Sequence, residues 1–109
     1  MPPTHVVRHG DSGWEPSKIP GVAFKSLRIA GEQGAGSYLV RMDPGTKHPP
    51  HNHPAGEEAY VVSGSMRVGR DELKTGDYLY TPPDASHDAD TKEGCTFLVV
   101  LPGPVQFLR

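Results

Sequence analysis

The chain has little cysteine, no long apolar run and no cluster of positive charge. Cys95 is its only cysteine, so no intrachain disulfide can form. No apolar run approaches the roughly 18 residues that suggest a membrane-spanning helix. The formal net charge is -2 and no run of Lys or Arg stands out, which argues against nucleic acid as a partner. Residues 1–14 lack the apolar stretch of a secretory signal, so we expect a cytoplasmic protein with no membrane partner.

Helical periodicity and internal repeats are also missing. The chain has instead 13 glycines and 12 prolines, which are spread between short apolar runs. This distribution is typical of an all-β domain with many turns. Because 109 residues can bury one core but not two, we expect a polar N-terminal arm over residues 1–20 and one domain over residues 21–109.

Short apolar runs predict the strands of this domain. Residues 95–101, CTFLVVL, form the most apolar run and predict a buried strand. Gly69-Arg70 predicts a tight hairpin. Strands at these intervals indicate a sandwich or a closed barrel, and the pattern alone does not choose between them. The expected strands are 22–29 with an imperfect alternation, 37–42, 58–62, 65–68, 71–73, 77–81 and 95–101.

One stretch carries histidines at a spacing suited to a metal ion. His51 and His53 are two positions apart, so on a strand both point to the same face. Glu57 follows a turn at residues 54–56 that can bring the next strand back toward the same ion, and His87 is a fourth candidate. Imidazole and carboxylate suit a first-row transition metal. A lone His-x-His pair, however, is most often surface chemistry or chance.

The residues around these histidines resemble the two motifs of the cupin superfamily. Two departures from the second motif concern turn shape and packing, not metal ligation: Asp84 replaces the usual Gly, and Thr91 stands where Asn is frequent. The matching positions of the first motif, at the motif's spacing, are Gly45, His51, His53, Glu57 and Gly64. Those of the second motif are Gly76, Pro82 and His87.

The resemblance implies a fold and a cofactor. The fold would be a double-stranded β-helix, the jelly-roll-like cupin barrel of a small single-domain microbial protein. The barrel would hold one divalent transition metal ion per chain, which could be Fe, Mn, Ni, Zn, Co or Cu. A small-molecule ligand or substrate and a homodimer formed through edge strands or exchanged arms are also implied. The implied metal ligands are His51, His53, Glu57 and His87.

A narrower resemblance bears on function. The run HPAGEEAYVVSG and the later Glu93-Gly94-Cys95 are similar to the cupin domains of anti-sigma factors and to acetylacetone-cleaving dioxygenases. This implies a metal-dependent cupin acting on a small molecule. It would be a dioxygenase with Fe(II), or an isomerase or hydrolase with another metal and Glu57 as a base. The alternative is a non-enzymatic sensing module with a closed, four-ligand site. A third reading is a metal-free barrel that binds a ligand such as a carbohydrate.

Several other side chains have both a functional and a structural interpretation. Near a metal, Tyr60 could orient a substrate or donate a proton, and Arg41 could clamp an anion. The more frequent roles are core packing for Tyr60 and a solvated strand position for Arg41. Cys95 is expected to be a small buried residue, and Trp14 to pack the arm against the barrel or a neighbouring subunit. The aromatic residues expected in the core or lining the pocket are Tyr60, Tyr78, Tyr80 and Phe97.

The remaining candidates are expected to lie away from the metal. We expect His48 on an exposed loop, and His5 and His9 in the arm without a ligand role. Glu58 alternates away from Glu57 and is expected outside the barrel. Glu58 would replace Glu57 as ligand only if the motif were one residue longer, and the distance to the following glycine would then no longer fit.

Overall fold

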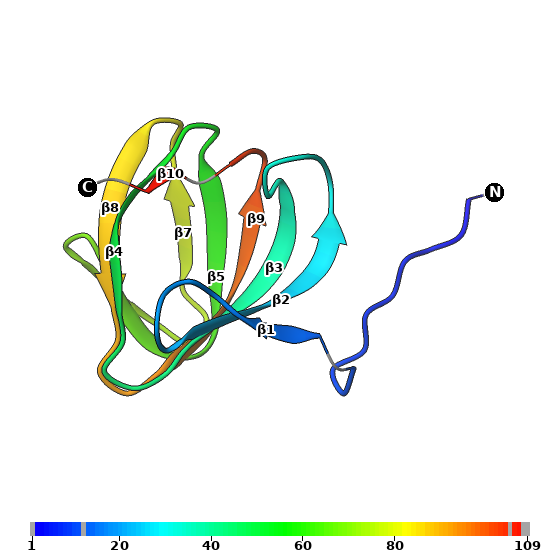
Figure 1. The fold of residues 1–109 in the computed structure, drawn as a ribbon. Coiled ribbons are helices and arrows are strands. Elements are labelled where there is room, and N and C mark those ends of the chain that lie inside the picture. The colour runs from blue at the N-terminus through cyan, green and yellow to red at the C-terminus, as the bar shows by residue number, and fades with distance from the viewer. Residues whose placement is uncertain (1, 12, 105, 108–109) are drawn as a thin grey trace.

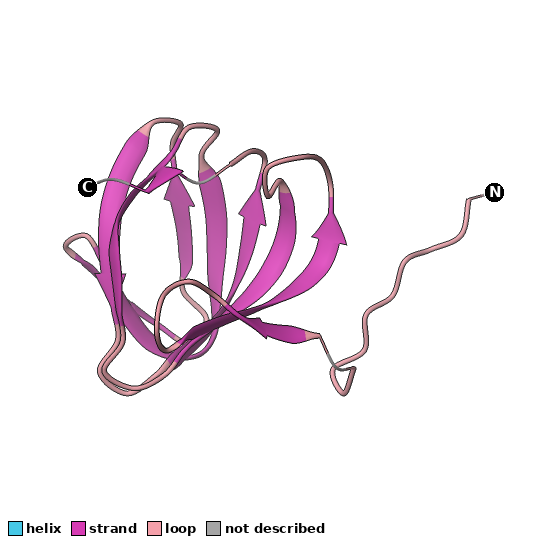
Figure 2. Ribbon diagram, viewed as in Figure 1, coloured by secondary structure: helices cyan, strands magenta, loops and turns pink. Residues whose placement is uncertain are grey.

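The computed structural model describes residues 2–11, 13–104 and 106–107, the last two by their backbone alone. Every regular element in these residues is a strand, as the turn-rich sequence predicted (Figure 2). Within the same residues, no helix has the length and apolarity needed to cross a membrane. The strands are β1 (Trp14–Pro16), β2 (Val22–Ile29), β3 (Gly36–Met42), β4 (Lys47–His53), β5 (Glu57–Val68), β6 (Asp71–Lys74), β7 (Tyr78–Thr81), β8 (Ala85–Asp90), β9 (Cys95–Leu101) and β10 (Gln106–Phe107).

The strands pair antiparallel and curl into a barrel-like double sheet (Figure 1). One sheet follows the order β1-β2-β3-β9-β5, with β7 on the other side of β5. The second sheet contains β10, β4, β8 and β6. The long strand β5 belongs to both, because its first half pairs with β9 and β7 and its second half with β8 and β6. The predicted all-β, double-sheet fold is confirmed.

Gly64 is the residue at which β5 passes from one sheet to the other. Its φ of 79° lies in the left-handed region that side chains disfavour. A Cβ atom at this position would collide with the carbonyl oxygen of Gly94. The register of β5 against β9 also shifts between Val61 and Ser63. The glycine that ends the first motif is therefore required by close backbone contact at the bend.

The two departures from the second motif have structural explanations. Asp84 adopts a φ of 63°, and Asp tolerates this region better than most residues, so the turn keeps a glycine-type conformation. Thr91 is buried, and its Oγ1 donates a hydrogen bond of 2.6 Å to the carbonyl oxygen of Ser65. The same Oγ1 accepts a bond of 2.9 Å from the backbone N–H of Gly94. Thr91 thus ties the turn before β9 to β5.

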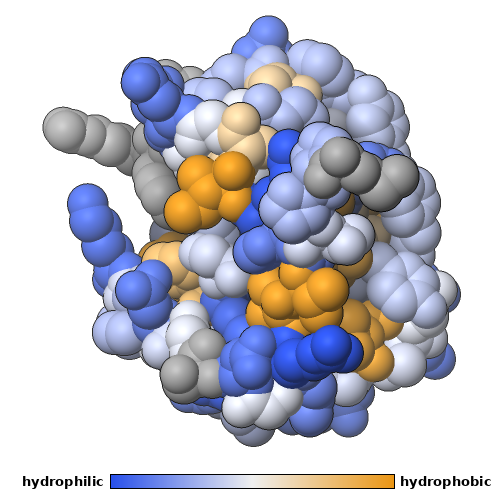
Figure 3. Space-filling model, turned by 90° about the vertical axis from the view of Figure 1, so that its right-hand side faces the viewer, coloured by the Kyte–Doolittle hydropathy of each residue, from blue (hydrophilic) through white to orange (hydrophobic). Residues whose placement is uncertain are grey.

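An apolar core fills part of the space between the two sheets. Cys95 is buried within it, as expected, and Phe97 packs against it. On the side seen in Figure 3, apolar residues form separate patches framed by hydrophilic ones. The apolar residues that gather in the core are Val61, Met66, Val68, Leu73, Ala89 and Cys95.

The N-terminal arm is partly built into the first sheet. Strand β1 pairs antiparallel with β2 and places Trp14 opposite Lys25. The guanidinium carbon of Arg41 lies 4.4 Å from the centre of the Trp14 ring. Trp14 therefore packs the arm against the outer face of its own barrel, which was one of the two expected roles. Before β1, a ring nitrogen of His5 lies 2.7 Å from the carbonyl oxygen of Leu27, and the carbonyl oxygens of Arg8 and Asp11 accept hydrogen bonds from Lys25. This part of the arm therefore contacts β2.

Candidate metal centre

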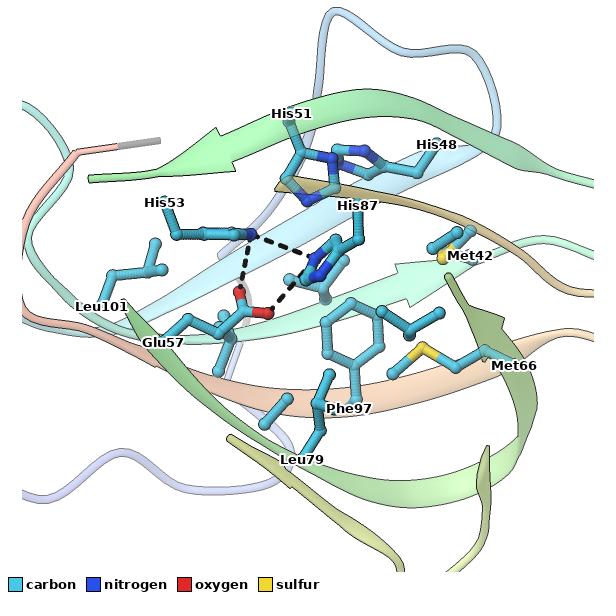
Figure 4. A pocket seen from close by; sticks show the side chains of 15 residues that line it. Met42, His48, His51, His53, Glu57, Met66, Leu79, His87, Phe97 and Leu101 are labelled. Carbon is cyan, nitrogen blue, oxygen red and sulfur yellow. Dashed lines mark hydrogen bonds and ion pairs between the residues drawn. The ribbon is translucent and has the colours of Figure 1, made fainter. Parts of the chain in front are cut away.

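Three strands bring the four predicted ligands to one place (Figure 4). His51 and His53 lie on β4 and face inward together, as their spacing predicted. Strand β8 pairs antiparallel with β4 and places His87 directly opposite His51. Glu57 is the first residue of β5, just beyond a turn at Gly56, whose backbone N–H donates to the carbonyl oxygen of His53.

The distances between these groups fit a single ion. The ligand nitrogens of His51, His53 and His87 all lie within 4.8 Å of one another. His53 Nε2 is 3.2 Å from His87 Nε2. Glu57 Oε2 is 3.5 Å from His53 Nε2, and Glu57 Oε1 is 3.7 Å from His87 Nε2. The three imidazole nitrogens therefore form one cluster, and the Glu57 carboxyl group lies beside those of His53 and His87.

The protonation of the site follows from its burial. Burial, followed by the neighbouring imidazoles, lowers the pKa of His53 to about 3. Burial also lowers the pKa of His51 and of His87. All three rings are therefore neutral near pH 7, and their contacts with Glu57 are not strong ion pairs. Burial raises the pKa of Glu57 to about 7. A weak 3.5 Å hydrogen bond donated by the Thr81 hydroxyl group acts in the opposite direction and lowers this pKa.

The donor set fits a transition metal. His51 Nδ1 lies 2.8 Å from the carbonyl oxygen of Pro49, so Nδ1 carries the proton and Nε2 presents its lone pair to the centre. Nδ1 of His53 is buried and finds no hydrogen-bond partner within the described residues. Lone pairs of neutral imidazoles and a carboxylate thus converge in a buried place, which a divalent cation would stabilise.

His48 is a polar neighbour that was wrongly expected on an exposed loop. It lies on β4, is half-buried, and its ring centre is 4.2 Å from that of His51. A register shift between His48 and His51 turns His48 toward the same cavity. Burial, with His51 as the second cause, lowers the pKa of His48 to about 4. The site therefore contains a fourth neutral imidazole beside the predicted three.

Two other candidates lie outside the barrel. Tyr60 is 46% exposed, and Arg41 is exposed and stacks on Trp14, so neither side chain reaches the centre. The expectation that Tyr60, Tyr78 and Tyr80 pack in the core is wrong, because all three are exposed. Glu58 is exposed, as predicted, and accepts a 2.7 Å hydrogen bond from the hydroxyl of Tyr78.

A cavity of about 120 Å³ adjoins the four ligands. This is small beside the roughly 300–1,000 Å³ of drug-sized ligand sites. No Lys or Arg of the described residues lines it, so polar chemistry is confined to the histidines and Glu57. Its apolar walls include Val40. They also include Met42, Met66, Leu79, Phe97 and Leu101, which are labelled in Figure 4.

The fold agrees with comparisons to known proteins. Residues 3–106 match the family model described as the ChrR cupin-like domain. The chain belongs to this cupin family. Over 91 residues it is 30% identical to the DNA damage-repair/toleration protein DRT102 of Arabidopsis thaliana. That match covers 78% of the cupin chain but only 28% of the Arabidopsis protein.

Solved structures share the fold. The polyketide cyclase RemF from Streptomyces resistomycificus is 27% identical with a TM-score of 0.80, over 97% of this chain and 86% of that chain. An acetylacetone dioxygenase from Acinetobacter johnsonii is 17% identical with a TM-score of 0.86, over 100% and 80% of the two chains. The complex of SigE with the anti-sigma ChrR from Rhodobacter sphaeroides gives 25% identity and a TM-score of 0.74, over 86% and 51%.

Proposed function

We propose that His51, His53, Glu57 and His87 bind one divalent transition metal ion, and that a small molecule reaches this ion in the adjoining cavity. The observation that carries the proposal is the convergence of three imidazole nitrogens within 4.8 Å, with the Glu57 carboxyl group beside them. Neutral imidazoles and a carboxylate are donors that such ions prefer. The cavity of about 120 Å³ limits the ligand to a small compound with a mainly apolar body.

The residues have distinct roles in this proposal. The imidazoles act as nitrogen donors, and the Pro49 carbonyl orients the ring of His51. Glu57 can act as a ligand or, when detached, as a base that takes a proton, because burial raises its pKa to about 7. The apolar walls exclude water from the centre. The bound ion would polarise a carbonyl group or, as iron(II), activate dioxygen.

The reaction class we favour is that of a dioxygenase. The fold similarity to the acetylacetone dioxygenase supports it, as does a cavity without cationic residues, which suits a chelating substrate of low charge. Both atoms of dioxygen would enter the organic product, and the substrate would supply the four electrons. An isomerase, hydrolase or cyclase would use the same centre without dioxygen, and the similarity to RemF supports that variant.

A second candidate function is metal or ligand sensing without catalysis. The match to the ChrR cupin-like domain and the similarity to the complex of the anti-sigma ChrR favour it. In this case the four ligands would close a tetrahedral site and leave no position for a substrate.

Metal analysis of the purified full chain tests both candidates. We expect about one ion per chain after expression with mixed divalent metals, and X-ray absorption then counts the ligands. Five or six ligands, including water, would favour small-molecule chemistry, and four would favour sensing. A metal-free protein from supplemented medium would overturn both.

We also propose that the chain forms a homodimer. Exposed aromatic residues on the outer faces of β5 and β7 support this. Tyr60, Tyr78 and Tyr80 are between 46% and 58% exposed. Sedimentation of the full chain should give twice the mass of one chain. The Tyr80→Lys variant should sediment with a lower average mass, because the added charge weakens the dimer. Monomeric sedimentation of the unmodified chain at high concentration would contradict the proposal.

A further inference from the structure

A second cleft lies on the opposite side of the first sheet from the metal centre. It has a volume of about 350 Å³ and is bounded by the outer face of β2, β3, β9 and β5 and by the turn of the arm before β1. Leu27, Leu39 and Val62 give it apolar surface, while Arg8, Lys25 and Arg41 bring positive charge. This cleft has both cationic side chains and an apolar wall, whereas, among the described residues, no Lys or Arg lines the cavity at the metal centre.

Lys25 is the unusual residue of this cleft. Its side chain is only 3% exposed, although Lys is rarely buried without a partner. Its Nζ donates to the backbone carbonyl oxygens of Arg8 at 3.2 Å and of Asp11 at 2.7 Å. No ion pair joins Lys25 to a carboxylate within residues 2–11 and 13–104. The two carbonyl oxygens satisfy hydrogen bonds of this buried ammonium group but do not pair its charge, so an anion in the cleft would stabilise it.

Arg41 adds a second, pre-oriented cation. Its guanidinium stacks on Trp14 at 4.4 Å, which fixes its plane. In the sheet register Arg41 stands opposite Thr96, and Thr96 stands opposite Ser63. A guanidinium and two hydroxyl groups therefore form one row across three strands. None of these three side chains makes a hydrogen bond or ion pair with another described residue.

The carboxyl group of Asp11 forms its hydrogen bond within the turn and makes no ion pair with Lys25 or Arg41. Its Oδ2 accepts a 2.7 Å hydrogen bond from the backbone N–H of Arg8, within the turn itself. The backbone N–H of Asp11 donates in turn to the carbonyl oxygen of Arg8. This turn covers Lys25 and forms one wall of the cleft.

We propose that this cleft binds a small organic carboxylate with an apolar body. The carboxylate would accept hydrogen bonds from Arg41 and from the hydroxyl groups of Thr96 and Ser63, with Lys25 and Arg8 adding positive charge. The apolar body would lie on the leucine and valine surface of the cleft. This site is separate from the metal centre, because the sheet lies between them and the two share no lining residue.

Trp14 supplies a direct test, because it is the only tryptophan of the chain and lines the cleft. The full chain is titrated with hexanoate while Trp14 fluorescence is recorded, and the dissociation constant is checked by calorimetry. We expect saturable binding, weakened about tenfold or more by Arg41→Gln. The matched control is Arg28→Gln, which removes an exposed arginine of β2 that does not line the cleft. His51→Ala should also leave hexanoate affinity unchanged.

Two comparison probes sharpen the result. Hexanol has the same apolar body without charge, and inorganic phosphate has charge without the apolar body. Both should bind at least about tenfold more weakly than hexanoate, because each loses one half of the recognition. Hexanol or phosphate binding as well as hexanoate would overturn the proposal. So would hexanoate affinity that Arg41→Gln leaves unchanged, or no saturable signal up to about 10 mM ligand.

Discussion

His53 Nε2 lies 3.2 Å from His87 Nε2, although the two residues are 34 positions apart in the chain. The pairing of β4 with β8 holds them there, since His51 stands directly opposite His87 in the same ladder. Burial keeps both rings neutral near pH 7, so their lone pairs are available without loss of a proton. The sheet thus presents a preformed nitrogen pair to a metal ion.

Replacing one of these rings should weaken metal binding. His53→Ala is expected to lower metal affinity by at least about 100-fold, because it removes one of the three imidazole donors and leaves three of the four proposed ligands. Competition with a chromophoric chelator measures the affinity. His9→Ala is the matched control, since His9 is exposed in the arm. Equal affinity of His53→Ala and the unmodified chain would contradict the proposed ligand set.

Metal removal should lower the thermal stability of the domain. At a free metal concentration of about 100 times the dissociation constant, binding stabilises the native state by about 2.7 kcal/mol. For a domain of this size that corresponds to a melting temperature higher by roughly 10 °C. Calorimetry of chelator-treated and reloaded protein checks this. The His53→Ala variant should show no such difference, and a difference of the same size would place the metal elsewhere.

The sequence predicted the strands that carry apolar alternation and missed those that do not. The run 95–101 was predicted with the bounds that β9 has. Strands β4 and β8 read KHPPHNH and ASHDAD, which are too polar for a hydrophobic pattern to reveal, although both carry the predicted ligands. Two separate strands were predicted at 58–62 and 65–68, whereas Gly64 lets the single strand β5 bend and continue through both.

The sequence also placed only some of the candidate site residues correctly. Glu57 and Glu58 could be told apart by motif spacing, and the structure buries the first and exposes the second. Tyr60 is two residues beyond Glu58, so strand alternation already placed it on the outer face, but its aromatic character favoured the core. His48 is three residues before His51 and would face outward on a regular strand. Only the register shift in β4, which the sequence does not reveal, turns it inward.

Two motif glycines should respond differently to alanine. Gly64 and Gly45 both have positive φ values, 79° and 81°, so alanine at either costs about 1–2 kcal/mol of backbone strain. A Cβ at Gly64 also meets the Gly94 carbonyl, whereas nothing lies within 4 Å at Gly45. Gly64→Ala should therefore destabilise the domain by at least about 3 kcal/mol, clearly more than Gly45→Ala. Urea unfolding with equal m values checks this, and equal losses would contradict it.

The buried thiol of Cys95 should make stability depend on pH in the alkaline range. Its side chain is 5% exposed, and burial, followed by the charge of Glu93, raises the pKa of the thiol from 9.0 to about 11. A folded-state pKa above the unfolded one means that stabilisation is fully present below pH 9 and is lost as the pH rises toward 11. Subtracting the pH profile of Cys95→Ala from that of the unmodified chain removes the contributions of Tyr and Lys.

The raised pKa of Cys95 also predicts that its thiol reacts slowly in the folded state. With a pKa of about 11, roughly one thiol in a thousand is ionised at pH 8, against about one in ten in the unfolded chain. Reaction of Cys95 with a disulfide reagent should therefore be at least about 100-fold slower in buffer than in concentrated urea at the same pH. Equal rates would show that the thiol is open to solvent, and the alkaline loss of stability should then be absent as well.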